Sequence, residues 1–365
     1  MIAGPPLYRA VAQRALLSRD RRGDIEIIRT FGTRFSKTRL AGRLTNLATY
    51  YMLAALAARR LECPDIIIAA TDPPLLGALG AMLKRRFGCR LVYNVRDLYP
   101  DIAYANGALK NPALLTTLRH ANAFAYAHSD AIVTLGHDMA ERIIAKGVPA
   151  AKVSVIPDWV DTTRIHPLAC NPFRAEFGDR FVVMYSGNIG LSQQLESVLD
   201  AAAMLAGDTR IVFLLIGEGA RKPALMKLAR ERGLANVKFL PYRPKEELAQ
   251  SLGAADLHLI PLMPGAAGCL VPSKIYAILA AGRPFVAMME PGAEVARIAL
   301  EHRVGFVVEP GDAVALARTI AGTAEDRDEL RAMGLRARAL AVNRFDRGLA
   351  TRAFAAMLAR VGEMA

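Results

Sequence analysis

The feature that most constrains the fold is a regular alternation, from about residue 61 onward, of short apolar runs with longer amphipathic segments. The short runs are rich in Val, Ile and Leu and have the length of buried strands, whereas the longer segments have helical periodicity. Strands that alternate with helices in this way build a parallel sheet with helices on its faces. The chain is therefore predicted to be an α/β protein.

The alternation occurs in two series, separated by a polar, proline-bearing stretch at 158–174. In the first series, strands are predicted at 65–70, 90–95, 131–134 and 153–156. In the second, they are predicted at 181–185, 210–216, 237–240, 257–260, 284–288 and 305–308. Helices between them are predicted at 75–87, 113–128, 195–205, 222–232, 245–252 and 274–281.

A chain of 365 residues is long for a single hydrophobic core, so two domains are expected. We predict two doubly wound, Rossmann-like domains that face each other across a cleft, which is the expected ligand site. Their ranges are 1–160 and 161–344, and a C-terminal helix at 345–365 is expected to pack back on the first domain.

The beginning of the chain departs from this pattern. A doubly wound domain opens with a strand, a glycine turn and a helix, but residues 1–6 read as the end of a strand followed by a Gly-Pro-Pro breaker. The first strand–helix unit of the N-terminal domain is therefore expected to be missing. Two explanations stay open: the unit is absent, or the start codon has been assigned too far downstream.

Positive charge is concentrated near the N-terminus. Residues 1–60 contain twelve Arg and Lys but only three acidic residues, out of a net charge of +13 for the chain. Such a segment suits an anionic membrane surface or a phosphorylated substrate, and a solvated basic face is the plain alternative. Nucleic acid is not expected as a partner, because no aromatic residues interleave with a basic stripe.

The composition argues against several other classes of protein. No apolar run has the length of about 20 residues that crosses a bilayer, and the N-terminus lacks the order of a signal peptide. A cytoplasmic protein, at most peripheral to the inner membrane face, is therefore predicted. The four cysteines are isolated in sequence, so neither a metal site nor a disulfide is expected.

Five collinear stretches carry a resemblance to a known family: 150–161, 183–190, 216–219, 236–241 and 272–284. Together they resemble glycosyltransferase family 4, and are most similar to the branch that assembles bacterial O-antigen, capsule and exopolysaccharide. The resemblance implies the GT-B fold, with an acceptor-side N-terminal domain and a nucleotide-sugar-binding C-terminal domain. It also implies retaining transfer from a nucleotide-diphosphate sugar to a lipid-linked or oligosaccharide acceptor, without a metal or other cofactor.

Donor-binding candidates come from the second half of the chain. Gly187, Asn188 and Gly190 form a glycine turn before a predicted helix, where backbone amides can face a diphosphate. Ser273 and Lys274 stand at the predicted start of another helix, where a hydroxyl and a cation can meet phosphate. A tight turn chosen for geometry alone and a solvent-facing lysine are the alternative readings.

Further candidates follow from the match to the family. Glu218 lies in a turn that borders the donor site in relatives, Glu294 lies in a stretch that faces the cleft, and Arg221 and Lys222 are secondary phosphate candidates. Both glutamates are equally well read as helix caps.

The sequence also departs from the family at donor contacts. Where many members have an arginine and a lysine, this chain has Asn188 and Gln193, and where they have two glutamates it has Cys269 and Ala277. We interpret these differences as a subtype with altered donor contacts.

In the first half, Arg96 and Asp97 follow a predicted strand at the edge where doubly wound domains build their sites. Relatives often have a His-Asp pair at this place, so these two residues are the catalytic candidates, with capping of the next turn as the alternative for Asp97. His137 stands where relatives often have a serine near the hinge and is a secondary candidate.

A helix predicted at 35–60 places Lys37, Arg39 and Arg43 beside Leu and Tyr residues, a combination that suits the surface of an anionic membrane. An ordinary core-packed helix with basic flanks is the alternative. Two other functions stay open for the chain as a whole: a nucleotide-sugar 2-epimerase, and a non-catalytic relative that binds a nucleotide sugar.

Overall fold

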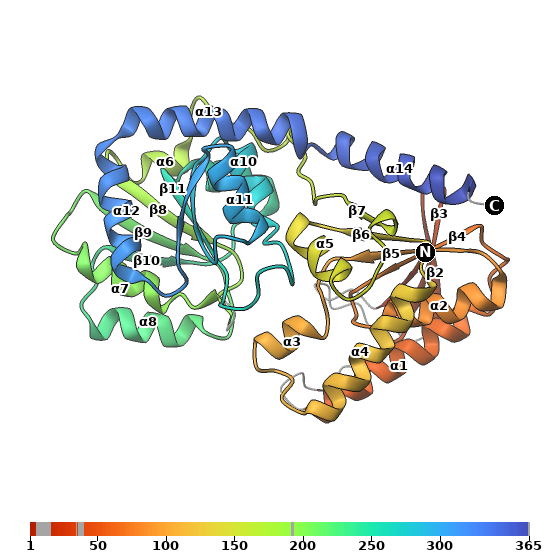
Figure 1. The fold of residues 1–365 in the computed structure, drawn as a ribbon. Coiled ribbons are helices and arrows are strands. Elements are labelled where there is room, and N and C mark those ends of the chain that lie inside the picture. Colours follow the sequence, from red (N-terminus) through yellow and green to blue (C-terminus); the bar gives the residue numbers. More distant parts are fainter. Residues whose placement is uncertain (5–15, 34, 36–39, 191–192, 364–365) are drawn as a thin grey trace.

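The computed structural model describes residues 1–4, 16–33, 35, 40–190 and 193–363. It contains two α/β domains, and Figure 1 shows each of them as a layer of strands covered by helices. The expected fold class, two Rossmann-like domains built on parallel sheets, is confirmed. The expectation of a missing first strand–helix unit falls largely on residues 5–15, which lie outside the described residues.

The C-terminal domain is built on a six-stranded parallel sheet with the order β10-β9-β8-β11-β12-β13. Its central strands are buried on both faces, as their uninterrupted apolar sequences predict. All six predicted strands are present, with ends that differ by no more than about one residue. The strands are β8 (Phe181–Ser186), β9 (Ile211–Ile216), β10 (Val237–Leu240), β11 (Leu257–Pro261), β12 (Phe285–Met288) and β13 (Gly305–Val308).

Helices cover both faces of this sheet, and the predicted helices are present there. The segment predicted as one helix at 245–252 is a short 3-10 turn, Lys245–Glu247, followed by α9. The helices are α6 (Pro172–Ala175), α7 (Glu196–Met204), α8 (Lys222–Glu231), α9 (Leu248–Gly253), α10 (Lys274–Ala280), α11 (Glu294–Glu301), α12 (Ala313–Glu325) and α13 (Arg327–Arg344).

The N-terminal domain contains a four-stranded parallel sheet with the order β4-β5-β6-β7 and a three-stranded sheet with the order β1-β3-β2. The four strands of the first sheet were predicted: β4 (Ile66–Ala70), β5 (Arg90–Val95), β6 (Ala131–Thr134) and β7 (Val153–Val155). In the second sheet, β1 (Ile2–Ala3) pairs parallel with β3 (Ile25–Thr30), and β2 (Leu17–Arg22) pairs antiparallel with β3.

The β2–β3 hairpin was not predicted. Its first strand has the sequence LSRDRR and is largely exposed, so it has no apolar alternation that marks a strand. The helices of this domain are α1 (Leu40–Ala58), α2 (Leu76–Phe87), α3 (Asp101–Ala105), α4 (Pro112–His128) and α5 (His137–Ile144). Helix α1 lies within the segment predicted at 35–60. None of the described helices is both long enough and apolar enough to cross a membrane.

The last helix, α14 (Arg347–Glu363), returns to the N-terminal domain. Its Met357 and Val361 pack with Val92 and Val133 of that domain in one buried apolar cluster. The chain thus passes between the domains twice, near Val160 and again near Phe345. These two passages are joined by backbone hydrogen bonds from Val160 N–H to Phe345 O and from Arg347 N–H to Val160 O, each 2.9 Å long.

Candidate functional site

Two glycine turns at the carboxyl ends of β8 and β9 pack directly against each other. A Cβ atom on Gly217 would lie 1.9 Å from the carbonyl oxygen of Gly187, and one on Gly219 would lie 2.2 Å from the carbonyl oxygen of Ile189. Gly217 and Gly219 also have φ angles of 153° and 156°, which favour glycine. The glycines at 217 and 219 are therefore required for the two turns to approach this closely.

Three amides of the first turn already have acceptors within the protein. Gly187 N–H donates to Ile216 O at 2.9 Å, Ile189 N–H donates to Glu218 O at 2.9 Å, and Gly190 N–H donates to Oε1 of Gln193 at 3.1 Å. The sequence suggested that these amides hold a diphosphate. In the structure, these three amides can face a diphosphate only if those hydrogen bonds are exchanged.

Lys274, at the start of α10, is the basic donor-site candidate whose surroundings differ from those of the other candidates. Its Nζ lies 4.0 Å from the ring centroid of Tyr185, at the end of β8, and 3.1 Å from the place where a Cβ on Gly187 would stand. Among the described residues it forms no ion pair with a carboxylate, and desolvation lowers its pKa to about 7. A half-buried ammonium without a carboxylate partner is a strong site for an anionic ligand.

Ser273 precedes Lys274 and is exposed, and its side chain does not cap α10. The structure thus brings together Gly187 and Lys274 from the donor-binding predictions, while Ser273 is linked to them only as the residue before Lys274. Tyr185, which supports the ammonium, was not predicted as a site residue. The signal available in the sequence was an aromatic residue two positions before the glycine turn.

The other basic candidates are occupied. Lys222 Nζ donates to Gly217 O at 2.9 Å, to Oε1 of Glu218 at 2.7 Å and to Leu240 O at 3.2 Å. These bonds tie the second glycine turn to the end of β10, so Lys222 has a structural role here. Glu218 contributes to this arrangement through both its carboxylate and its backbone carbonyl.

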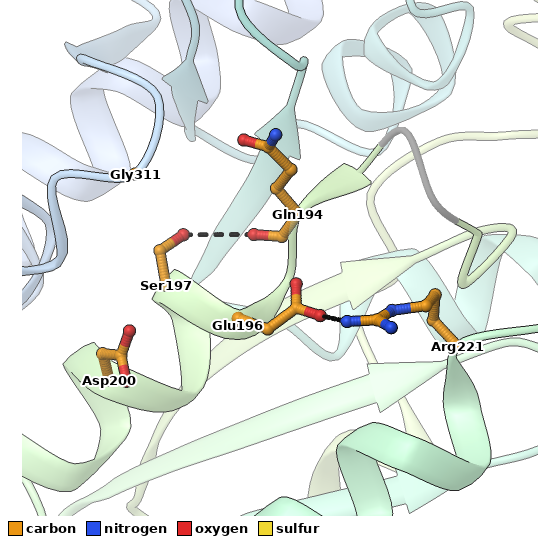
Figure 2. Close-up of a pocket in the computed structure, with 6 residues that line it drawn as sticks. All are labelled: Gln194, Glu196, Ser197, Asp200, Arg221 and Gly311. Carbon is orange, nitrogen blue, oxygen red and sulfur yellow. Dashed lines mark hydrogen bonds and ion pairs between the residues drawn. The ribbon is translucent and has the colours of Figure 1, made fainter. Parts of the chain in front are cut away.

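Arg221 forms an ion pair with Glu196 beside a pocket of about 550 Å³, which Figure 2 shows between the starts of α7 and α8 and the loop at Gly311. The pocket is lined by Gln194, Glu196, Ser197, Asp200, Arg221 and Gly311. Its carboxylates disfavour a phosphate, and its one cation is already paired. This pocket is therefore not the site that the sequence predicted.

On the N-terminal domain, Thr71 positions the two catalytic candidates. Its Oγ1 accepts hydrogen bonds from Arg96 N–H at 3.0 Å and from Asp97 N–H at 3.1 Å. The Arg96 guanidinium is paired with Asp158 at 2.6 Å. Desolvation and the charge of Asp72 raise the pKa of Asp97, while Arg96 opposes this shift.

The Asp97 segment also meets the second domain. Asp97 and Leu270 form an isolated antiparallel bridge, and Leu98 N–H donates to Cys269 O at 2.6 Å. Cys269 is buried, and Arg142 of the first domain donates to its Sγ at 3.3 Å. The place of one family glutamate is thus taken by a thiol enclosed between the domains.

A second polar contact between the domains involves His137, Asp138 and Glu294. The Glu294 carboxylate accepts from His137 N–H at 2.8 Å and contacts His137 Nδ1 at 3.1 Å. In return, Asp138 Oδ2 accepts from Glu294 N–H at 2.9 Å and from Gly268 N–H at 3.0 Å. Each acid thus caps the helix of the other domain, and we call this group the interdomain clasp. Asp138 was not predicted.

Burial at the clasp raises the pKa of Asp138, although three backbone amides stabilise its ionised form. His137 and Glu294 were both predicted as ligand contacts. The structure brings them together with each other and gives Glu294 the capping role that the sequence left open as an alternative. No group of three or more potential metal ligands occurs within the described part of the chain.

Comparison with known proteins agrees with this architecture. Residues 7–159 match the model described as "Glycosyl transferase 4-like domain", and residues 180–326 match "Glycosyl transferases group 1". The chain is 30% identical to the probable glycosyltransferase WbjE of Pseudomonas aeruginosa over 79% of its length and 73% of that protein. It is 31% identical to WcaI of Escherichia coli strain K12, a putative colanic acid biosynthesis glycosyl transferase, over 75% of the chain and 70% of WcaI.

Solved structures show the same fold at lower sequence identity. Anabaena HepE, solved in complex with UDP, has a TM-score of 0.72 and 19% identity, over 92% of this chain and 86% of HepE. Sucrose-phosphate synthase from Thermosynechococcus elongatus has a TM-score of 0.78 and 17% identity, over 96% of this chain and 86% of the synthase. The predicted family is therefore confirmed: the chain belongs to the family 4 glycosyltransferases of the GT-B fold.

Proposed function

We propose that this glycosyltransferase moves a sugar, with retention of configuration, from a nucleotide-diphosphate donor to a lipid-linked or oligosaccharide acceptor in the assembly of a bacterial surface polysaccharide. The observation that carries the proposal is the Lys274 ammonium, which is half-buried and lies over Tyr185 without a carboxylate partner among the described residues. Beside it, Gly187 leaves space that any larger residue would fill.

The proposed reaction requires a cation beside the departing diphosphate. The acceptor hydroxyl oxygen bonds to the anomeric carbon, the bond from that carbon to the diphosphate breaks, and the hydroxyl proton leaves with the diphosphate. Negative charge grows on the diphosphate as the bond breaks, and a preorganised ammonium in a poorly solvated site stabilises it. Asp97 and Arg96 are the residues that we propose to meet the sugar or acceptor from the first domain.

The relatives support the class of substrates. HepE has been solved with UDP and with UDP-glucose, and WcaI is named for colanic acid biosynthesis. A lipid-linked acceptor places the reaction at the cytoplasmic face of the inner membrane. No metal or other cofactor is part of the proposed reaction, because Lys274 takes the role of the cation that offsets the diphosphate charge.

The proposal is tested by nucleotide binding to a Lys274→Ala variant. Titration calorimetry with UDP and GDP should show a dissociation constant roughly 100-fold larger than that of the unchanged protein, because one buried charge-assisted contact is lost. Lys227→Ala, which removes an exposed lysine of α8, is the matched control and should bind normally. Equal affinity in the Lys274→Ala variant would show that Lys274 does not hold the diphosphate.

A second candidate is a non-catalytic protein that binds a nucleotide sugar, which Cys269 and Ala277 favour because both stand where many members have glutamates. Labelled nucleotide sugars incubated with a bacterial membrane lipid extract separate the functions. Label that enters the lipid fraction supports transfer, and binding without turnover supports the non-catalytic protein. An epimerised nucleotide sugar would instead indicate the 2-epimerase activity.

A further inference from the structure

Three helices of the N-terminal domain lie together on one side of its parallel sheet. Figure 1 shows α1, α2 and α4 side by side, and α2 packs against both of the others. None of the three contains an Asp or a Glu residue. Acidic residues make up about one in eleven of the whole chain, and α13, of similar length to α1, has Asp328 and Glu329 in its first turn. We call this acid-free surface the three-helix face.

Apolar side chains project from the three-helix face. Met52 is 64% exposed, Met82 is 56% exposed and Leu56 is 40% exposed. Met52 and Leu56 are four residues apart on α1, so they share one side of that helix. Their neighbours Leu53 and Ala57 are buried. Helix α1 therefore presents one apolar stripe to the protein and a second one to the outside.

Exposed arginines occur on the same helices or directly after them. Arg59 and Arg60 follow Leu56 at the end of α1, Arg85 and Arg86 follow Met82 within one turn of α2, and Arg119 lies on α4; all are exposed. In the described part of the chain none of these five forms an ion pair. In the C-terminal domain, Arg210, Arg232 and Arg336 are each paired with a carboxylate, whereas Arg230 and Arg331 are exposed and form no ion pair with the described residues.

We propose that the three-helix face docks on a bilayer that contains anionic phospholipid. Exposed Met and Leu side chains can enter the boundary between headgroups and acyl chains, while arginines around them meet lipid phosphates. The three helices themselves contain no carboxylate that an anionic surface would repel, and the exposed Glu62 and Asp65 lie beyond the end of α1. A nucleic acid is a poorer fit, because Tyr50, Tyr51 and Phe87 of these helices are at least half-buried and offer no exposed stacking platform.

The proposal is more specific than the membrane surface that the sequence suggested at 35–60. Lys37 and Arg39 lie outside the described residues, and the side chain of Arg43 does too. The purpose of docking rests on the proposed function, since a lipid-linked acceptor lies at the membrane. Docking itself is measured without sugar transfer, so the two proposals fail separately.

Co-sedimentation with vesicles of phosphatidylcholine and phosphatidylglycerol in equal amounts tests the face. The double variant Arg85→Gln/Arg86→Gln should partition into the vesicle pellet roughly 25-fold less than the unchanged protein, about fivefold for each arginine. The matched control is Arg230→Gln/Arg331→Gln, which removes the same charge from exposed sites on the other domain. It should bind as the unchanged protein does.

The insertion of apolar side chains is tested with Met52→Ser/Met82→Ser, which should reduce the partition roughly tenfold and should do so at high salt as well. Circular dichroism melting checks that each variant is folded. Equal losses in the control variant, or strong binding to vesicles of phosphatidylcholine alone that no arginine change weakens, would overturn the proposal. Binding to RNA without binding to the anionic vesicles would overturn it too.

Discussion

The Lys274 site and the interdomain clasp are both polar regions beside buried apolar residues, but they satisfy their charged groups differently. In the clasp, Asp138 and Glu294 accept five contacts between them from the described residues, and each carboxylate caps a helix of the opposite domain. At the Lys274 site, the ammonium has an aromatic ring beneath it and no carboxylate partner among the described residues.

The comparison distinguishes a structural contact from the proposed ligand site. A buried charged group whose hydrogen bonds are complete gains little interaction free energy from a ligand. A buried charged group without an opposite charge beside it gains the most. Sequence patterns alone placed Glu294 and Lys274 in one class of donor contacts. Their surroundings differ: Glu294 caps a helix of the opposite domain, whereas Lys274 has no carboxylate partner among the described residues.

The largest effect is expected from a change that disrupts the two glycine turns beside the proposed ligand site. In Gly217→Ala, the new Cβ would lie 1.9 Å from the carbonyl oxygen of Gly187, at a φ of 153°. Neither backbone can move away without disturbing the ends of β8 and β9. The free energy of unfolding should fall by about 4 kcal/mol, measured by urea denaturation.

Gly233→Ala is the control for this substitution. Gly233 also has a positive φ, of 65°, but a Cβ there would meet nothing within 4 Å. The Gly233→Ala substitution should lower the free energy of unfolding by only about 1 kcal/mol. Similar losses in both variants would show that the contact between the two glycine turns does not determine the stability of this edge.

The next effect concerns the clasp. Asp138→Ala leaves the amides of Gly268 and Glu294 without their acceptor in a buried region, so the free energy of unfolding should fall by about 3 kcal/mol. Asp312→Ala, which removes the exposed cap of α12, should cost only about 1 kcal/mol in the same urea experiment. An Asp138→Ala loss no larger than that of Asp312→Ala would contradict the structural role of the clasp.

The smallest effect is the pH dependence of nucleotide binding. The pKa of Lys274 is lowered to about 7 by desolvation, so the free protein loses this positive charge as the pH rises through 7. The affinity for UDP should therefore be highest below pH 7 and fall above it, by at most about tenfold per pH unit for one proton. Calorimetric titrations between pH 6 and 9 measure this slope, and Lys274→Met should remove it.

The stability of the free protein changes in the opposite direction. An unfolded lysine titrates near 10.5, so between pH 7 and 10.5 the unfolded chain binds more protons than the native one at this position. The contribution of Lys274 to stability is thus unfavourable below pH 7 and becomes less so as the pH rises. A saturating nucleotide should cancel this gain by holding the lysine protonated. An identical pH slope in Lys274→Met would refute the assignment.

The sheets could be predicted well because their strands are buried on both faces, so that apolar runs such as Ile211–Ile216 stand out in the sequence. The β2–β3 hairpin could not be predicted from the same signal. Its stability depends on pairing with its neighbour, as in the contact of Arg19 with Ile28, and the exposed strand needs no apolar residues for that. Periodicity reports burial, and this hairpin is only partly buried.

The candidate residues of the proposed site come from motifs that are local in sequence. Lys274 and the glycine turns were found from short motifs. The hydrogen-bond partners of other candidates lie in different segments of the chain. Glu294 is 157 residues from His137, and Leu240 supplies an acceptor to Lys222. No pattern in one segment reveals such a partner. The sequence therefore could not distinguish Lys222, whose ammonium is paired with Glu218, from Lys274, whose ammonium has no carboxylate partner among the described residues.

The paired passages of the chain near Val160 and Phe345 have a mechanical consequence. Two covalent links that are hydrogen-bonded to each other, with Thr162 and Asp346 joined at 2.6 Å beside them, behave as one narrow hinge. Rotation of the domains about this hinge keeps those bonds but must break the clasp and the hydrogen bond from Leu98 N–H to Cys269 O, whereas sliding or twisting must break the bonds of the hinge as well. Any opening that keeps the bonds of the hinge is a rotation about a fixed line, in which the residues farthest from that line travel the greatest distance.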